Sequence, residues 1–284
     1  MRILLISLTL LFVAAPTGQG QPYGALSAGG LAYRGSVLKE NGAYVSGYLA
    51  FSYPAWLQTE ISATQTWIRY RDNTQLNQQE GFASFTLYPR TGRWLRAGFH
   101  AIQTSDPLTR GSTTFFVGGG IYQPYRWHVG VTGYWTRYPS YEPEMLQVFQ
   151  IEPVVGRSMF ELYTNRTLQA TLIPRMILLD QRLTLGKQVF YSLELQLTYQ
   201  SGPWRIESML WSGEQVFALR GYGAVVFNLP EKHTGGYAFG LRYPANRTFQ
   251  GALHLYVEQF RDIGFDEDVR VLVPTITLSY RHTP

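Results

Sequence analysis

Ionisable side chains recur at alternate positions of many short segments, and their types set the chemistry that the chain could perform. Along residues 191–200, Glu194 shares one face with Ser192 and Gln196. The same spacing places further ionisable residues on polar faces: Glu60, Arg96, His100, Glu161, Arg205, Glu207, Arg220, Arg242, His254 and Glu258. Carboxylates and guanidinium groups on such faces can line a pore that selects solutes by charge and hydrogen bonding.

These side chains allow a second interpretation, in which they pair with one another in a filled interior. Small barrels fill their interiors with side chains, and burial favours pairing of opposite charges. The sequence alone leaves both interpretations open. If the interior is an open pore, we expect these residues to line it: Arg96, His100, Glu194, Arg220, Arg242, His254 and Glu258.

Hydrolytic chemistry is the main enzymatic alternative. A serine nucleophile needs a base within hydrogen-bond reach and a third group that orients the base. Ser105 and Asp106 follow His100 at five and six residues, a spacing that indicates no particular geometry. The remaining histidines are His128, His233, His254 and His282. We expect no catalytic site.

Metal and cofactor sites are also not predicted. The chain contains no Cys, which excludes thiolate ligands and thiol nucleophiles. The acidic segment 262–268 lacks the full pattern of a calcium loop. Gly118, Gly119 and Gly120 lie within a strand-like segment, where glycine indicates close packing or a bend.

The elements that position these residues are strands, most clearly at 191–200. Tyr191, Leu193, Leu195, Leu197 and Tyr199 alternate there with polar residues, so one face is apolar and the other polar. A tilted strand of about 9–11 residues crosses a bilayer, and aromatic side chains mark the two interfaces. This segment therefore reads as one strand of a transmembrane barrel.

Similar segments recur along the chain, separated by alternately short and longer links. The alternation predicts an all-β, membrane-spanning, antiparallel up-and-down barrel of about 14 strands, with 12 or 16 as alternatives. Residues 146–155 and 158–165 read as two strands joined at Gly156-Arg157, and residues 217–227 as a further strand. Region 167–187 is ambiguous, either a strand pair or one strand with a long loop.

Composition agrees with a barrel wall, since only 15% of residues are charged while 15% are aromatic. The net charge of +5 is spread along the chain, which gives no reason to expect nucleic-acid binding. Residues 1–20 read as a signal peptide, with Arg2 before an apolar run and small residues at its end. We expect residues 21–284 to form one barrel domain. A soluble β-sandwich or lipocalin-like barrel is the rival, but so many apolar faces would need a very large core.

The C-terminal strand resembles the assembly signal of bacterial outer-membrane β-barrels. In that superfamily the last strand alternates apolar residues and ends in an aromatic one, a pattern matched by Ile276, Leu278 and Tyr280, although residues 281–284 follow. The resemblance implies a Gram-negative-type outer membrane, contact with its lipid bilayer, and insertion by the barrel assembly machinery through this strand. It assigns no specific family and no oligomeric state.

Three functions are compatible with this resemblance. We favour a porin-like channel for small hydrophilic solutes. A non-conducting scaffold or binding barrel of an envelope assembly is the second hypothesis. The third is a lipid-modifying barrel enzyme similar to outer-membrane phospholipases or lipid A deacylases, but the chain lacks the His-x-Ser-Asn type of setting that those families show.

Overall fold

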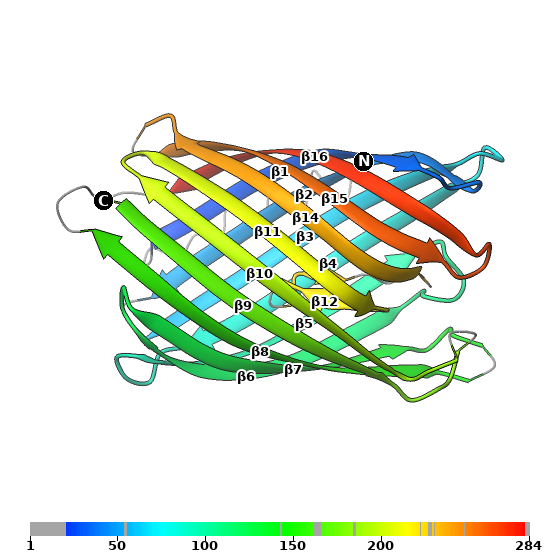
Figure 1. The fold of residues 1–284 in the computed structure, drawn as a ribbon, viewed down its shortest axis with the longest axis horizontal. Coiled ribbons are helices and arrows are strands. Elements are labelled where there is room, and N and C mark those ends of the chain that lie inside the picture. Colours follow the sequence, from blue (N-terminus) through cyan, green and yellow to red (C-terminus); the bar gives the residue numbers. More distant parts are fainter. Residues whose placement is uncertain are drawn as a thin grey trace.

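The fold is a single closed barrel of antiparallel strands, seen in a computed structural model (Figure 1). The structure describes residues 21–281 apart from 54–55, 143, 162–165, 184–185, 222, 227–228, 230 and 247. The expected signal peptide, residues 1–20, and His282 lie outside the described residues. Among the described residues, no helix is long and apolar enough to cross a membrane.

Fourteen strands form the wall, and each pairs with its neighbours in the order β1-β16-β15-β14-β11-β10-β9-β8-β7-β6-β5-β4-β3-β2, where β1 closes on β2. The predicted fold class and strand number are therefore confirmed. The wall strands are β1 Gln21–Arg34, β2 Lys39–Tyr53, β3 Leu57–Tyr70, β4 Gln75–Leu87, β5 Arg93–Thr104, β6 Ser112–Gln123, β7 Trp127–Tyr138, β8 Leu146–Glu161, β9 Arg166–Leu179, β10 Val189–Ser201, β11 Trp204–Gln215, β14 Glu231–Pro244, β15 Phe249–Asp262 and β16 Glu267–Arg281.

The two ends of the barrel differ in their links. At one end, which we call the turn end, short links such as 88–92, 124–126 and 202–203 join the strands, and Tyr23 of β1 pairs with Arg281 of β16. The opposite, loop end carries longer links, including 105–111, 139–145 and 180–188. The link 216–230 between β11 and β14 belongs to the loop end and contains the short strands β12 Leu219–Arg220 and β13 Val225–Val226.

Three segments differ from, or resolve, the sequence interpretation. Residues 146–161 form one strand, so the expected turn at Gly156-Arg157 is wrong. Gly156 instead allows a close approach inside the barrel, because a Cβ there would fall on the ring of His128. The ambiguous region resolves into β9 and one loop. The expected strand 217–227 is also wrong, since Phe217, Gly221 and Gly223 have φ values of 52°, 59° and 87°.

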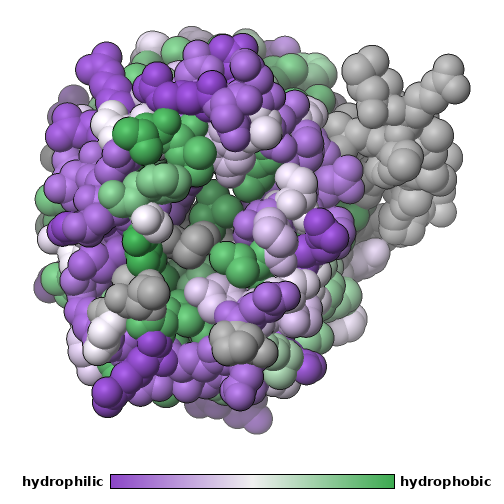
Figure 2. Space-filling view, turned by 90° about the vertical axis from the view of Figure 1, so that its right-hand side faces the viewer, coloured by the Kyte–Doolittle hydropathy of each residue, from purple (hydrophilic) through white to green (hydrophobic). Residues whose placement is uncertain are grey.

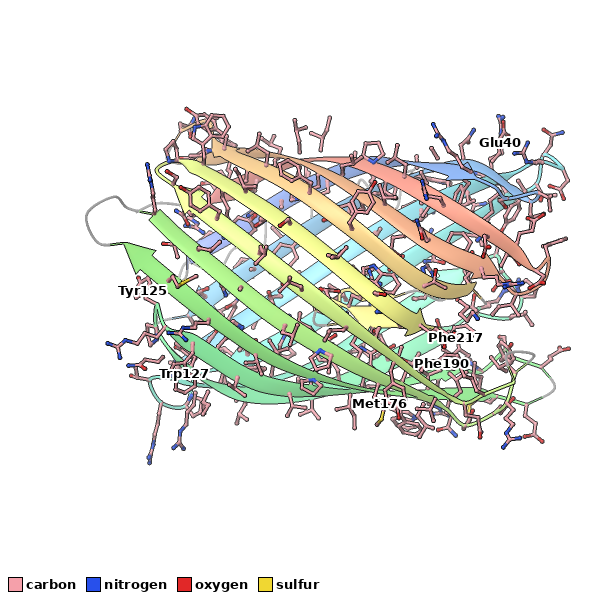
Figure 3. All side chains as sticks on the ribbon, viewed as in Figure 1. Glu40, Tyr125, Trp127, Met176, Phe190 and Phe217 are labelled. Atoms are coloured by element: carbon pink, nitrogen blue, oxygen red, sulfur yellow. The ribbon has the colours of Figure 1, made fainter. Side chains whose placement is uncertain are left out.

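The barrel is apolar outside and largely polar inside, as the alternation predicts. On β10, Tyr191 is 63% and Tyr199 is 36% exposed on the outer face, whereas Ser192 and Glu194 are buried inside. Further exposed aromatic side chains lie near the turn end, including Tyr125 and Trp127 in Figure 3. The loop end has a polar rim, and apolar side chains lie within the hollow behind it (Figure 2).

One seam of the wall is interrupted near its middle. The register of β8 and β9 runs to Ile151–Met176 and resumes at Val155–Leu172. Pro153 and Pro174 occupy the gap, while each stays paired with its other neighbour, Val131 of β7 and Leu193 of β10. Because proline has no N–H, it cannot donate to a ladder. The two prolines therefore leave the β8–β9 seam without its central hydrogen bonds.

Candidate constriction inside the barrel

The link 216–230, which we call the inner loop, turns into the barrel (Figure 1). The first four residues after β11 are fully buried, unlike the outward-facing residues of the wall: Val216, Phe217, Ala218 and Leu219. The pairing of β11 with β14 shifts register between Ser212 and Gln215, which bends the chain at this point. The inner loop is therefore the part of the chain that narrows the lumen.

Apolar packing holds the start of the inner loop against one side of the wall. The ring of Phe217 lies 4.8 Å from that of Tyr138 and 6.1 Å from that of Tyr141, measured between centroids. Ile177 and Phe190 belong to the same buried cluster, and Figure 3 shows Phe190 near Phe217. These contacts hold the inner loop against β7–β10. On the opposite side of the lumen, the loop borders a cavity.

The side chain of Gln150 forms two hydrogen bonds with the backbone of Leu219, the next part of the inner loop. Nε2 of Gln150 on β8 donates to the Leu219 carbonyl oxygen at 2.7 Å, and the Leu219 backbone N–H donates to Oε1 of Gln150 at 2.9 Å. The Leu219 side chain packs with Phe82, Phe116 and Tyr134. Both backbone polar groups of Leu219 are satisfied, which a buried backbone requires.

Arg220 anchors the inner loop to the far wall. Its Nη1 lies 2.6 Å from Oε1 of Glu258 on β15, and its Nε and Nη2 donate to Oε1 of Gln215 at 3.0 and 2.8 Å. The guanidinium also lies 4.0 Å from the centroid of the Trp211 ring. A planar guanidinium meets several partners at once in this way.

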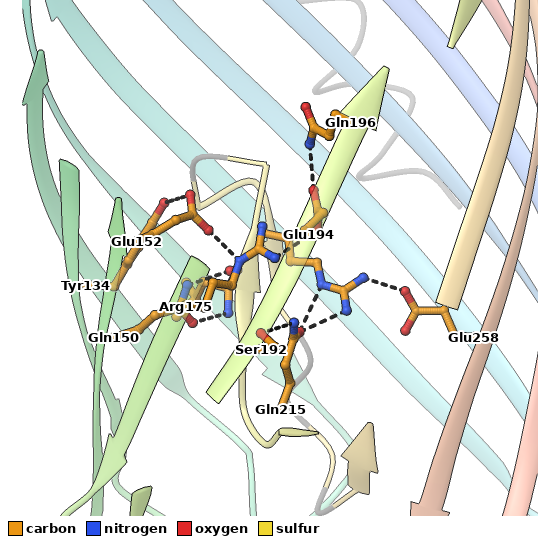
Figure 4. Close-up of polar contacts among 11 residues, drawn as sticks. Tyr134, Gln150, Glu152, Arg175, Ser192, Glu194, Gln196, Gln215 and Glu258 are labelled. Carbon is orange, nitrogen blue, oxygen red and sulfur yellow. Dashed lines mark hydrogen bonds and ion pairs between the residues drawn. The ribbon is translucent and has the colours of Figure 1, made fainter. Parts of the chain in front are cut away.

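A second buried arginine lies behind the inner loop on the wall itself. Nε of Arg175 on β9 lies 2.6 Å from Oε2 of Glu152, and its Nη1 lies 2.8 Å from Oε2 of Glu194 (Figure 4). The hydroxyl of Tyr134 donates to Glu152, and Nε2 of Gln196 donates to Glu194. Arg175 thus joins β8 to β10 across β9, directly inside the interrupted seam.

His100 contacts the tip of the inner loop from β5. Its Nδ1 lies 2.7 Å from the Gly223 carbonyl oxygen, which only accepts, so Nδ1 carries a proton. Its Nε2 lies 3.2 Å from Oε2 of Glu80. Gly223 also approaches Phe116 so closely that a Cβ would lie 2.8 Å from the ring.

The remaining expected lumen residues form two clusters closer to the turn end. Arg96 lies 2.5 Å from Glu60, whose other oxygen accepts from the Tyr48 hydroxyl. Arg242 lies 3.5 Å from Glu207, and Glu207 and His254 both line a pocket of about 250 Å³. Arg205 lies 2.7 Å from Glu207. The side chain of Glu161 lies outside the described part of the structure.

The structure thus brings two of the expected lumen residues, Arg220 and Glu258, together. Glu194, Arg96 and Arg242 each lie beside a residue of opposite charge. One residue stands on a different element from that expected, since Arg220 belongs to the inner loop and not to a wall strand. Sequence reasoning missed Arg175, Gln150 and Gln215. Arg175 shares its face with Ile173 and Ile177, so no polar alternation marks it.

Among the described residues, two larger cavities lie inside the barrel. One, of about 520 Å³, lies between the inner loop and strands β1–β4 and β14–β16. The other, of about 540 Å³, lies toward the turn end and includes Glu60, Arg96 and Trp127 in its lining. Each has the size of a small-molecule site.

Acidic residues at the link between β15 and β16 are paired with neighbouring protein groups. Nε of Arg261 lies 2.6 Å from Oδ1 of Asp266 and lowers the pKa of that carboxyl. Oε2 of Glu267 accepts from the Val37 backbone N–H. Across the described residues, no group of three or more His, Asp or Glu is placed to hold a metal ion.

Comparison with known proteins identifies the fold and no family. No protein-family model matches the sequence, and no curated protein resembles it in sequence. Among solved structures, it is similar to the toluene transporter TbuX of Ralstonia pickettii, with a TM-score of 0.57, 8% identity, and coverage of 93% of this chain and 90% of that one.

Two further structures are similar at the same level. The CymD monoaromatic hydrocarbon channel has a TM-score of 0.56 and 10% identity, covering 93% of this chain and 89% of that chain. A bacterial polysaccharide outer membrane secretin has a TM-score of 0.55 and 10% identity, covering 92% and 98%. This chain has the fold of bacterial outer-membrane β-barrels.

Proposed function

We propose that the protein is a porin-like channel of a Gram-negative-type outer membrane for small hydrophilic solutes. The observation that carries this proposal is the polar lumen, which keeps two cavities of about 520 and 540 Å³, the first bordered by the inner loop and the second toward the turn end. The outward apolar face suits lipid, and two of the similar structures are a channel and a transporter. The loop end, with its longer links, faces the outside, as in outer-membrane barrels generally.

Insertion through the C-terminal strand is part of the same proposal. Ile276 and Leu278 are more than half exposed on the outer face of β16, and Tyr280 ends the alternation. This pattern supports recognition by the barrel assembly machinery. The Tyr280→Ser variant should lower the amount of folded protein in the outer membrane. An unchanged amount would contradict recognition of the C-terminal strand through Tyr280.

Conductance of the refolded protein in a planar bilayer tests the channel. We expect small, steady steps, because the inner loop leaves narrow passages. The Arg96→Ala variant should shift the reversal potential toward cation selectivity, because Glu60 then loses its 2.5 Å partner. Arg69→Ala is the matched control, since Arg69 is exposed at the loop end and pairs with Glu40.

One observation favours the alternative of a non-conducting scaffold. The inner loop is packed and hydrogen-bonded on several sides, through Phe217, Leu219 and Arg220. A scaffold of this kind would insert without conducting and would co-purify with a stoichiometric partner. Inserted protein that never conducts would overturn the channel and support this second function.

A further inference from the structure

The cavity of about 520 Å³ has one wall of neutral hydroxyl groups, and we call it the hydroxyl chamber. That wall is formed by β1, β2 and β3 through six side chains: Ser27, Tyr44, Ser46, Tyr48, Ser62 and Thr64. We propose that the hydroxyl chamber binds an uncharged solute that carries several hydroxyl groups next to one apolar ring, as aryl glycosides do. The inference deepens the proposed channel and rests on it only for how the solute arrives.

The hydroxyl groups keep hydrogen-bonding capacity for a solute. The hydroxyl oxygens of Ser46 and Thr64 lie 2.9 Å apart, and those of Tyr44 and Thr275 lie 2.6 Å apart. A pair of hydroxyls has two O–H donors, and their mutual bond uses one of them. The second donor and the remaining lone pairs of each described pair can serve the hydroxyl groups of a solute.

The acidic groups that border the hydroxyl chamber are already paired with protein groups. Glu258 contacts Arg220 and His233. Glu231 contacts Lys39, and Glu80 lies 3.2 Å from Nε2 of His100. A charged solute would lose its hydration without gaining a counter-ion, which is costly. An uncharged solute avoids that loss.

Another part of the lining is apolar. Leu31 and Ile68 face the cavity from β1 and β3, and Val271 and Val273 face it from β16. Val225 of the inner loop also borders it. Apolar surface of this kind holds a ring or chain by burial, while a few polar groups fix its orientation. A solute with hydroxyl groups on one side and a ring on the other matches both walls.

Titration calorimetry with phenyl β-D-glucoside tests the proposal, on full-length protein refolded in a detergent without a sugar headgroup. We expect binding that is at least about tenfold tighter than that of phenyl phosphate or of glucose, which lack neutrality or the ring. In the Ser46→Ala/Thr64→Val variant the affinity should fall about tenfold, the effect of one or two lost hydrogen bonds. The matched control is Thr114→Val/Thr136→Val, a hydroxyl pair at 2.8 Å that does not line the chamber.

A second variant covers the event that the first one does not fold. Ser62→Leu fills the hydroxyl chamber from β3 and should abolish binding of the glucoside. Equal affinity for the glucoside and for phenyl phosphate, or binding unchanged by both chamber variants, would overturn the proposal even if the protein conducts. Glucoside binding in a protein that never conducts would overturn the channel and leave the chamber proposal standing.

Discussion

At the scale of single residues, the inner loop depends on Arg220. Its guanidinium meets Glu258 and Gln215 in a site where both charged side chains are at most 10% exposed. Removing one partner of a buried ion pair leaves a charge without compensation, whereas replacing both partners is better tolerated. Arg220 therefore fixes the position of the loop. Replacing the whole ion pair should cost less stability than removing Arg220 alone.

The Arg220→Met variant should lower the free energy of unfolding by about 3 kcal/mol or more, because the buried Glu258 carboxylate then loses its arginine partner and keeps its contact with His233. Urea unfolding in detergent micelles measures the change. The Arg220→Met/Glu258→Gln double variant should recover most of the loss. A double variant as unstable as the single one would show that charge pairing is not what Arg220 contributes.

Gly223 provides a second residue-scale test, at the tip of the inner loop. It combines a φ of 87° with a Cβ position 2.8 Å from Phe116, so alanine is strained there and also collides. Gly223→Ala should push the loop away from β6 and increase protease cleavage within residues 216–230. Gly133→Ala is the control, because a Cβ at Gly133 meets nothing within 4 Å. Equal cleavage of the two variants would contradict the close contact.

At the scale of elements, the interrupted β8–β9 seam is held by side chains and not by its ladder. Pro153 and Pro174 face each other on the outer side, and Arg175 bridges Glu152 and Glu194 on the inner side. The ion pairs thus cross the point where backbone hydrogen bonds are missing. The seam should be the least protected part of the wall.

Hydrogen exchange checks the seam. Amides at 151–155 and 172–176 should exchange faster than those of the continuous β10–β11 ladder at 193–197. Arg175→Met should speed this exchange further, and Pro153→Val/Pro174→Val should slow it by supplying two N–H donors. Exchange that is uniform along β8 to β11 would show that the seam is as tightly closed as its neighbours.

The elements also show what the sequence could predict. Strict alternation at 191–200 identified β10, its outer face and the buried Glu194, because period two follows directly from strand geometry. The inner loop was mistaken for a strand, since Phe217 and Leu219 alternate with Ala218 and Arg220 in the same way. Alternation of apolar and polar residues indicates that one side of a segment is buried. A loop that crosses the lumen is also buried, so alternation alone does not distinguish it from a wall strand.

The same limit explains the missed residues of the constriction. Arg175 lies between apolar neighbours on its face, and its partners Glu152 and Glu194 come from other strands. Gln150 was not marked by charge or motif, although it brackets Leu219. Such contacts depend on how strands are placed around a closed wall, and local sequence does not encode that placement.

At the scale of the whole molecule, a wide barrel is divided by one loop of its own chain. A wall of 14 strands encloses more space than the side chains of its inner face fill, and the inner loop occupies part of it. Its apolar end packs on β7–β10, and its charged end reaches β15. The loop therefore narrows the lumen beside the cavity of about 520 Å³.

Single-channel conductance of the wild type and of a loop-shortened variant tests this account most directly. In the variant, residues 218–225 are replaced by a short Gly-Ser link, and circular dichroism confirms that the barrel is retained. We predict small steps for the wild type and steps several times larger for the variant, because the loop is what narrows the lumen. Equal steps in the two proteins, or no conductance in either, would contradict the claim that the inner loop constricts a channel.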